Sequence, residues 1–287
     1  MTQGVLHSNK VPSTSSRRVS PALGTEFFEL NLREPQPPDV VEAIRSAFFD
    51  TGLVLVRGQD LSFEQQESFS SYVGKPTKRV PKGLIPGTDE LPTTEMYISN
   101  TRPEGYAREG SLLKHSDYCF VEDLLLGVGL YGEAVASTGG ATIFVNAKLA
   151  ADRLSDELRA RLESLDVRHV YDLDGVEEGF KKYDIAGKSH ALSHVRPALL
   201  KHPVTGETIL YVNELMTDRV EGLAPRDSDE LLNEVYAVLD DPALRYDHTW
   251  AVGDVIIFDN IKLQHGRTEM PEGQRRSLRR LMLDIAS

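Results

Sequence analysis

A histidine and an aspartate separated by one residue, with a second histidine much later in the chain, are the clearest candidates for chemistry. His115 and Asp117 lie in the run LLKHSDYCF (112–120). Alternate residues of a strand share a face, so we expect both side chains to point the same way if this run is extended. His265 follows the apolar stretch VIIFDN (255–260). Two histidines and one carboxylate form the facial triad of mononuclear non-haem iron(II). The alternative is an ordinary strand end and a turn histidine bonded to backbone.

The last apolar segment, QRRSLRRLMLDIA (274–286), carries several arginines. Read as a strand, it places Arg276 and Arg280 on one face among apolar residues. A buried guanidinium is costly without an anion, and its natural partner is a carboxylate held by two hydrogen bonds. The alternative is a basic surface run. Arg275 and Arg279, on the opposite face, are expected to be such surface charges.

Together these motifs resemble the taurine dioxygenase / 2,4-dichlorophenoxyacetate dioxygenase (TauD/TfdA) family of iron(II)- and 2-oxoglutarate-dependent oxygenases. That family has a His-x-Asp motif, a Gly-Gly-x-Thr turn, a distal histidine after a segment like WDN, and two arginines in the last strand. The matching motifs here are HSD at 115–117, GGAT at 139–142, FDNIKLQH at 258–265, and Arg276 and Arg280. The resemblance runs from about residue 25 to the end of the chain, and the spacings between its motifs are similar too.

The resemblance implies three iron(II) ligands: His115, Asp117 and His265. It further implies that Thr142 and Arg276 bind the far carboxylate of 2-oxoglutarate, and that O2 is the other co-substrate. Arg280 is expected to meet an acidic group of the substrate, and Tyr118 is a candidate substrate contact. The implied reaction is oxidation of an unactivated C–H bond of a small anionic or zwitterionic molecule, most simply hydroxylation, with release of succinate and CO2.

Two departures from the family bear on specificity. Lys114 precedes the first ligand, where several relatives have an aromatic residue; we expect it on the outer strand face, and the alternative is a charge at the rim of the site. Taurine dioxygenase has a histidine in its first lid, whereas PTKRVPKGLIP (76–86) has none, which makes taurine a doubtful substrate. Asp117 favours hydroxylation over halogenation, because iron halogenases of related fold lack this carboxylate. Desaturation, cyclisation and oxidative cleavage stay open.

The elements that must position these residues are mostly strands. Apolar runs predict strands at 53–58, 95–100, 124–135, 141–147 and 255–260, and a hairpin around VTG (204–206). Helices are expected at 62–74, 154–165 and 227–241, the first with Ser62 as its N-cap. Because strands do not alternate with crossover helices, we expect a mostly antiparallel barrel or jelly roll with flanking helices. The resemblance implies the double-stranded β-helix. We expect a flexible arm at 1–24 and one domain at 25–287, with lid segments near 75–111 and 172–195.

Composition limits the function classes. The 287 residues include 32 Lys and Arg against 44 Asp and Glu, a net charge of −12, which argues against a nucleic-acid partner and against an anionic membrane surface. Cys119 is the one cysteine, and no apolar run approaches the ~18 residues of a membrane span, so we expect a cytoplasmic protein. The family resemblance allows a homo-oligomer, dimer or tetramer. Two other classes stay open: a non-catalytic metabolite-binding jelly roll, and a zinc hydrolase, which would leave Arg276 and Thr142 unexplained.

Overall fold

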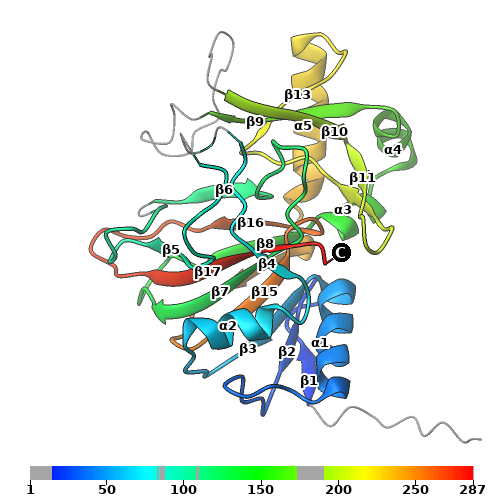
Figure 1. Cartoon of the computed structure of the whole chain (residues 1–287). Helices are drawn as coiled ribbons and strands as arrows, with labels where there is room; N and C mark the ends of the chain where they lie inside the picture. The colour runs from blue at the N-terminus through cyan, green and yellow to red at the C-terminus, as the bar shows by residue number, and fades with distance from the viewer. Residues whose placement is uncertain (1–14, 83, 85–87, 108–109, 173–190, 287) are drawn as a thin grey trace, which may run out of the picture.

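The computed structural model describes residues 15–82, 84, 88–107, 110–172 and 191–286 (Figure 1). The second expected lid, 172–195, lies mainly outside these residues. The expected arm at 1–24 lies partly outside them, but its last residues belong to the fold, because β1 (Ser16–Arg18) pairs with β2 (Thr25–Phe27) in the main sheet. No helix in the described part of the chain is both long and apolar enough to cross a bilayer.

Most strands belong to two sheets. The large sheet has the order β1-β2-β3-β15-β7-β17-β4, and β5 also pairs with β17. Its further strands are β3 (Leu53–Val56), β4 (Lys75–Thr77), β5 (Met96–Ser99), β7 (Gly127–Ala134), β15 (Val255–Asp259) and β17 (Ser277–Asp284). The small sheet has the order β14-β8-β16-β6. Its strands are β6 (Leu112–His115), β8 (Thr142–Asn146), β14 (Arg245–His248) and β16 (Leu263–Arg267). Among these strands only β2 and β3 pair in parallel.

The two sheets face each other through aromatic side chains. Phe258 of β15 lies with its ring centroid 5.1 Å from that of Phe144 on β8 and 4.8 Å from that of His265 on β16. Phe144 and Phe258 have no exposed surface. Face-to-face packing of two mainly antiparallel sheets confirms the jelly roll expected from the sequence. His265 therefore points into the space between the sheets.

Smaller elements extend one end of this sandwich. A three-stranded sheet contains β9 (Asp166–Asp172), β10 (Ala191–Pro197) and β13 (Thr217–Val220), and a hairpin contains β11 (Leu199–Lys201) and β12 (Thr208–Leu210). The helices are α1 (Pro38–Thr51), α2 (Phe63–Ser70), α3 (Ala147–Asp152), α4 (Asp156–Leu162) and α5 (Pro225–Leu239), with a 3-10 turn at Pro242–Leu244. In Figure 1, α5 lies with β9, β10 and β13 at one end of the molecule, and α1 and α2 lie at the other.

The helices form where the sequence provides one apolar face and residues that cap the helix ends. In α1 the buried residues Val40, Ile44 and Phe48 recur every four positions, so they share one face. The helix ends at Thr51, and the capping residue Gly52 has a φ of 78°, a left-handed conformation that favours glycine. In α2 the side chains of Ser62 and Gln65 cap each other's backbone N–H groups, which confirms the N-cap expected from the sequence.

Candidate metal and co-substrate site

The two histidines are neighbours across adjacent strands. His115 ends β6 and pairs in register with His265 of the antiparallel strand β16. Their ring centroids are 4.3 Å apart. Together with Asp117 they form the one group of three or more acidic, His or Cys side chains, within the described ranges, whose ligand atoms all lie within 4.8 Å of one another. The sequence expectation that these three residues meet is thus matched by their geometry.

Asp117 reaches this position from a turn, not from a strand. The expected extended run 112–120 ends as a strand at His115, and 117–120 form turns. The Asn260 side chain holds this turn: its Oδ1 accepts from the Asp117 N–H at 2.7 Å, and its Nδ2 donates to the Asp117 carbonyl at 2.9 Å. The next residue, Tyr118, has a φ of 61°, a conformation uncommon outside glycine. Strand alternation predicted that His115 and Asp117 lie close together. What places Asp117 beside His115, however, is a turn held by Asn260.

The hydrogen bonds and the surroundings of the two histidines suit metal binding. His115 Nδ1 lies 2.9 Å from the Leu113 carbonyl; as a donor there, it leaves Nε2, 3.3 Å from Asp117 Oδ1, as the free lone pair. Burial, reinforced by His115, lowers the pKa of His265 to about 3 although Asp117 opposes this. His265 is therefore a neutral imidazole at ordinary pH, as a metal ligand must be.

Asp117 remains a carboxylate in spite of its surroundings. Burial raises its pKa, but Arg280, His265 and His115 outweigh this effect and hold the pKa well below its usual value. The closest of these groups is the Arg280 guanidinium, whose Nη2 lies 2.5 Å from Asp117 Oδ2. Two imidazoles and one carboxylate are a donor set that fits a divalent transition metal such as iron(II), and that also fits zinc.

A second cationic group lies buried beside the GGAT turn. Arg276 donates from Nε to the Gly140 carbonyl (3.1 Å) and from Nη2 to Thr142 Oγ1 (3.2 Å). Its Nη1 is buried and has no hydrogen-bond partner in the described part of the chain. Burial and the nearby Arg267 lower the pKa of Arg276 to about 9. A desolvated guanidinium with an unused N–H edge is suited to a carboxylate, so this feature fits a carboxylate co-substrate.

The glycines of the GGAT turn make room for this arrangement. Gly139 has a φ of 68°, and a Cβ there would lie 2.4 Å from the Glu269 carbonyl oxygen. Gly140 has a φ of 66° and a Cβ there would lie 3.4 Å from Arg276 Cδ. The turn therefore requires glycine for backbone conformation at both positions and for space at the first.

Two residues of this region were not singled out by sequence reasoning. Trp250 donates from Nε1 to Thr142 Oγ1 at 2.9 Å. Arg267, buried on β16, donates from Nε to the Gly110 carbonyl at 2.9 Å. Parity could have identified Arg267, because it lies two residues after His265 on one strand. Nothing local to Trp250 indicates that its indole meets Thr142, since their contact depends on how β14 pairs with β8.

The expected substrate side of the site is built from Arg280 and Tyr118. Besides its ion pair with Asp117, Arg280 has Nη1 3.3 Å from Met96 Sδ on β5. The Tyr118 phenol donates to the Arg79 carbonyl at 3.3 Å. Burial raises the pKa of Tyr118 to about 12, with Arg280 opposing and Asp117 adding to the rise. The phenol is therefore protonated at ordinary pH.

One expectation about the last strand was wrong. Arg279 was expected to be a surface charge, but only 6% of it is exposed. Its Nε donates to Gln66 Oε1 at 2.7 Å, and its Nη2 donates to the Leu61 carbonyl at 2.9 Å. Residues at and before the start of α2 cover the outer face of β17, so that face is not in solvent. Arg275 is exposed, as expected.

Lys114 faces away from the metal ligands. Its ammonium forms ion pairs with Asp240, just beyond α5, and with Glu214. The residue is largely buried, because these segments cover the outer face of β6. The position on the outer strand face that the sequence favoured is confirmed, although that face is not open to solvent.

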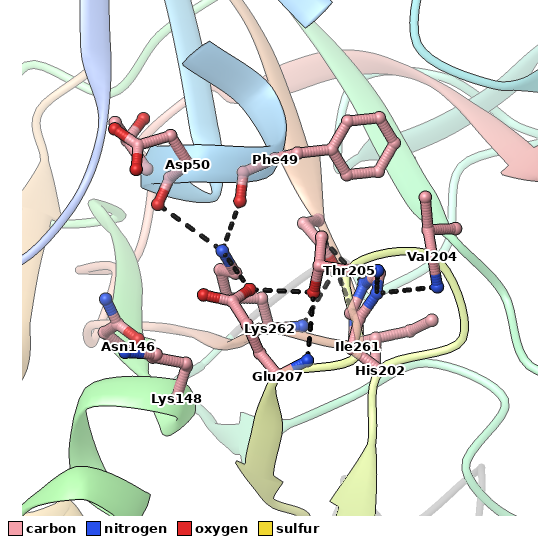
Figure 2. A network of polar contacts seen from close by, with 12 residues as sticks. Phe49, Asp50, Asn146, Lys148, His202, Val204, Thr205, Glu207, Ile261 and Lys262 are labelled. Atoms are coloured by element: carbon pink, nitrogen blue, oxygen red, sulfur yellow. Dashed lines mark hydrogen bonds and ion pairs between the residues drawn. The ribbon is translucent and has the colours of Figure 1, made fainter. Parts of the chain in front are cut away.

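The turn between β15 and β16, which carries Asn260, is anchored by a buried polar network. Figure 2 shows Lys262 between the carbonyl groups of Phe49 and Asp50, at the end of α1, and the carboxylate of Glu207. Asp259 accepts from the Lys262 N–H at 2.8 Å and lies 3.0 Å from His202 Nε2. Backbone N–H groups donate to His202 Nδ1, so Nε2 carries the proton and donates to Asp259. The FDN segment therefore acts as a structural anchor close to the metal ligands.

The chain is similar in sequence and in fold to several known proteins. A model of the taurine catabolism dioxygenase TauD, TfdA family matches residues 15–282. Pentalenolactone F synthase of Streptomyces arenae is 31% identical over 84% of this chain and 85% of its own length. The (S)-phenoxypropionate/alpha-ketoglutarate-dioxygenase of Sphingobium herbicidovorans is 28% identical over 81% of this chain and 82% of its own. A crystal structure of a taurine dioxygenase from Burkholderia xenovorans superposes with a TM-score of 0.77 at 25% identity, covering 96% of this chain and 90% of that one.

Proposed function

Because the chain belongs to the taurine catabolism dioxygenase TauD, TfdA family, we propose that His115, Asp117 and His265 bind iron(II) and that 2-oxoglutarate and O2 are its co-substrates. The enzyme oxidises an unactivated C–H bond of a small molecule, most simply by hydroxylation, and releases succinate and CO2. The observation that carries this proposal is the buried Arg276, whose Nη1 has no partner in the described structure and which lies in the same sandwich as the three metal ligands. A zinc hydrolase would leave Arg276 and Thr142 without a role, whereas turnover to succinate distinguishes the oxygenase from a binding module that uses the same arginine.

Each protein group has a defined task. The two imidazoles and the Asp117 carboxylate would hold iron(II). Arg276 and the Thr142 hydroxyl bind the far carboxylate of 2-oxoglutarate by charge-assisted hydrogen bonds. Iron(II), when bound, supplies the redox chemistry that couples O2 reduction to decarboxylation of the co-substrate and oxidation of the substrate. The closed aromatic core around Phe144 and Phe258 excludes water from this side.

The substrate is a small anionic or zwitterionic molecule. Arg280 is buried beside Asp117, and its guanidinium is the cationic group on this side that would meet a substrate anion. Tyr118 lies at the same side. Named relatives act on (S)-phenoxypropionate and on sulfate esters, which suggests small anions as first candidates. Taurine is a weaker candidate, because the segment 76–86 contains no histidine.

Two measurements test the proposal. Anaerobic addition of iron(II) and 2-oxoglutarate is expected to produce a weak visible charge-transfer band, and in air the purified enzyme should form succinate when a true substrate is present. Sulfonates, aryloxy acids, sulfate esters and amino acids form the first screening panel. Binding of iron without such a band, and no succinate from any compound, would sink the oxygenase assignment. Restoration of a turnover by zinc but not by iron would indicate the hydrolase instead.

We further propose that the protein is cytoplasmic and acts as one domain, and the family resemblance allows a homo-oligomer, dimer or tetramer. The net charge of −12 and the single buried Cys119 support a reducing, soluble environment. Sedimentation of the purified protein would give the oligomeric state directly.

A further inference from the structure

We propose that Trp250 is a positioning residue, which orients the Thr142 hydroxyl so that its hydrogen is donated to the co-substrate carboxylate. The proposal rests on the function inferred above and deepens it. It concerns the only tryptophan of the chain, a side chain that touches neither the metal ligands nor the substrate side in any contact described here.

The argument begins with the hydrogen bonds at one oxygen. The indole N–H is a donor and cannot accept, and it lies 2.9 Å from Thr142 Oγ1. Arg276 Nη2, also a donor, lies 3.2 Å from the same oxygen. A hydroxyl oxygen has two lone pairs, and both are now used. The hydroxyl hydrogen must therefore point away from Trp250 and Arg276.

The hydrogen left over has no acceptor among the described residues. The same holds for Arg276 Nη1, which is buried and unpartnered. The Thr142 hydroxyl and Arg276 Nη1 are thus two donors without an acceptor in the described structure, on side chains that are hydrogen-bonded to each other. Such a pair matches the two oxygens of one carboxylate. By donating to Thr142 Oγ1, Trp250 leaves the Thr142 hydroxyl to act as a hydrogen-bond donor toward a ligand. An anionic ligand requires such a donor. Without the indole N–H, the hydroxyl could turn and use its hydrogen elsewhere.

Trp250 is itself held in place. His248, directly across from Thr142 in the β14–β8 register, lies edge-on to the indole with centroids 4.6 Å apart at 85°. Its Nε2 lies 3.0 Å from Asp254 Oδ2, which also accepts from the Ala251 N–H at 3.0 Å. On another side, a Cβ at Gly132 would lie 3.2 Å from the indole Cε3, so the ring has little room to move.

The test uses full-length protein loaded with Mn(II), and calorimetric titration with 2-oxoglutarate. Trp250→Phe keeps an aromatic ring but removes the N–H. It is expected to raise the Kd for 2-oxoglutarate about three- to tenfold, as for the loss of one hydrogen bond. Thr142→Val should raise it at least as much. In the double variant the losses should not add, because Trp250 acts through the Thr142 hydroxyl. Tyr131→Phe, which also removes one buried aromatic donor, is the matched control and should bind as the wild type does.

A second readout needs no variant of the site. Since Trp250 is the sole tryptophan, 2-oxoglutarate should change the intrinsic tryptophan emission saturably, with the same Kd as calorimetry gives. Wild-type-like binding by Trp250→Phe, additive losses in the double variant, or an equal loss in Tyr131→Phe would each overturn the positioning role. Failure of the Mn(II)-loaded wild type to bind 2-oxoglutarate would instead overturn the proposed function, and this inference with it.

Discussion

At the scale of single residues, the site depends on pairing buried charges. Asp117 would be costly as a buried carboxylate, but Arg280 lies 2.5 Å away and keeps it ionised. Arg276 lies in the opposite situation, since no carboxylate side chain pairs with it within the described structure. A buried cation without an anion is rare enough to indicate a ligand. Arg280 of β17 and Arg276, which directly precedes that strand, therefore have different tasks. Arg280 acts toward the metal ligand and Arg276 toward the co-substrate.

Removing the unpaired guanidinium should affect the co-substrate first. Arg276→Met is expected to raise the KM for 2-oxoglutarate by about 100-fold, since loss of one partner of a buried charge pair costs ~2–5 kcal/mol. Steady-state succinate formation at varied 2-oxoglutarate measures this. The neighbouring exposed residue offers a matched control, Arg275→Met, which should be unchanged. Equal KM values for both variants would contradict the assignment of Arg276.

At the scale of elements, the β15–β16 turn links the metal ligands to the rest of the fold. Asn260 holds the backbone of Asp117 by two hydrogen bonds. Lys262, in the same turn, fastens it to the end of α1 and to Glu207 of the segment between β11 and β12 (Figure 2). The position of one metal ligand therefore depends on contacts that lie well outside the metal site.

Loosening the Asn260 clamp should weaken metal binding. Asn260→Asp retains an acceptor for the Asp117 N–H but loses the donor to its carbonyl. Groups that orient metal ligands typically change affinity by ~10–100-fold when mutated, and we expect about tenfold weaker Mn(II) binding by calorimetry. A lower Tm with unchanged metal affinity would mean that Asn260 stabilises the fold without positioning Asp117.

The Lys262–Glu207 pair should contribute to stability. Lys262 is almost fully buried, and Glu207 Oε2 lies 2.7 Å from its Nζ. Glu207→Ala leaves this ammonium with carbonyl partners alone and should lower the free energy of unfolding by about 2 kcal/mol. Glu230→Ala, which breaks an exposed i,i+4 pair with Arg226, should cost less than ~0.5 kcal/mol. Urea titrations of both variants measure the two losses in free energy of unfolding. Equal losses would show that the buried Lys262–Glu207 pair stabilises the fold no more than an exposed pair does.

The same pair predicts a pH dependence. Burial raises the pKa of Glu207, but its hydrogen bonds to Lys262 and Thr205 outweigh this and lower the pKa below 4.5. A depressed carboxyl pKa adds stability that is fully present above the unfolded value and is lost as pH falls through the folded value. The Tm difference between wild type and Glu207→Ala should therefore be constant from pH 7 to about pH 5.5 and shrink below pH 4.5. A difference that grows on acidification would contradict this sign.

At the scale of the whole molecule, the two sheets bring together residues that are far apart in the chain. The small sheet supplies His115, Thr142 and His265, and the large sheet and the turn before it supply Arg280 and Arg276. Ligands that bind between the sheets therefore connect both layers of the fold. Their binding should stabilise the folded state as a whole, because the unfolded chain has no such site.

Metal and co-substrate should raise the Tm together. At about 100 times its Kd, a ligand adds about 2.7 kcal/mol, which for a chain of this size corresponds to a shift of roughly 5 °C. Thermal unfolding with Mn(II), with 2-oxoglutarate and with both should show the largest shift for the pair, reversed by a chelator. In Arg276→Met the Mn(II) shift should persist while the 2-oxoglutarate increment is lost. An unchanged increment would separate 2-oxoglutarate binding from Arg276.

By itself, the sequence determined the jelly roll and the residues that gather at the site. The strand pattern, the His-x-Asp motif and the arginines of the last apolar segment are local or arise from family spacing, so they can be read along the chain. Three features depended on tertiary structure, because each is set by a partner distant in sequence. Asp117 is placed by a turn clamped by Asn260, Arg279 is buried because α2 covers its face of β17, and Trp250 reaches Thr142 only through the pairing of β14 with β8. Period-two alternation tells which residues share a face, but only packing decides what covers that face.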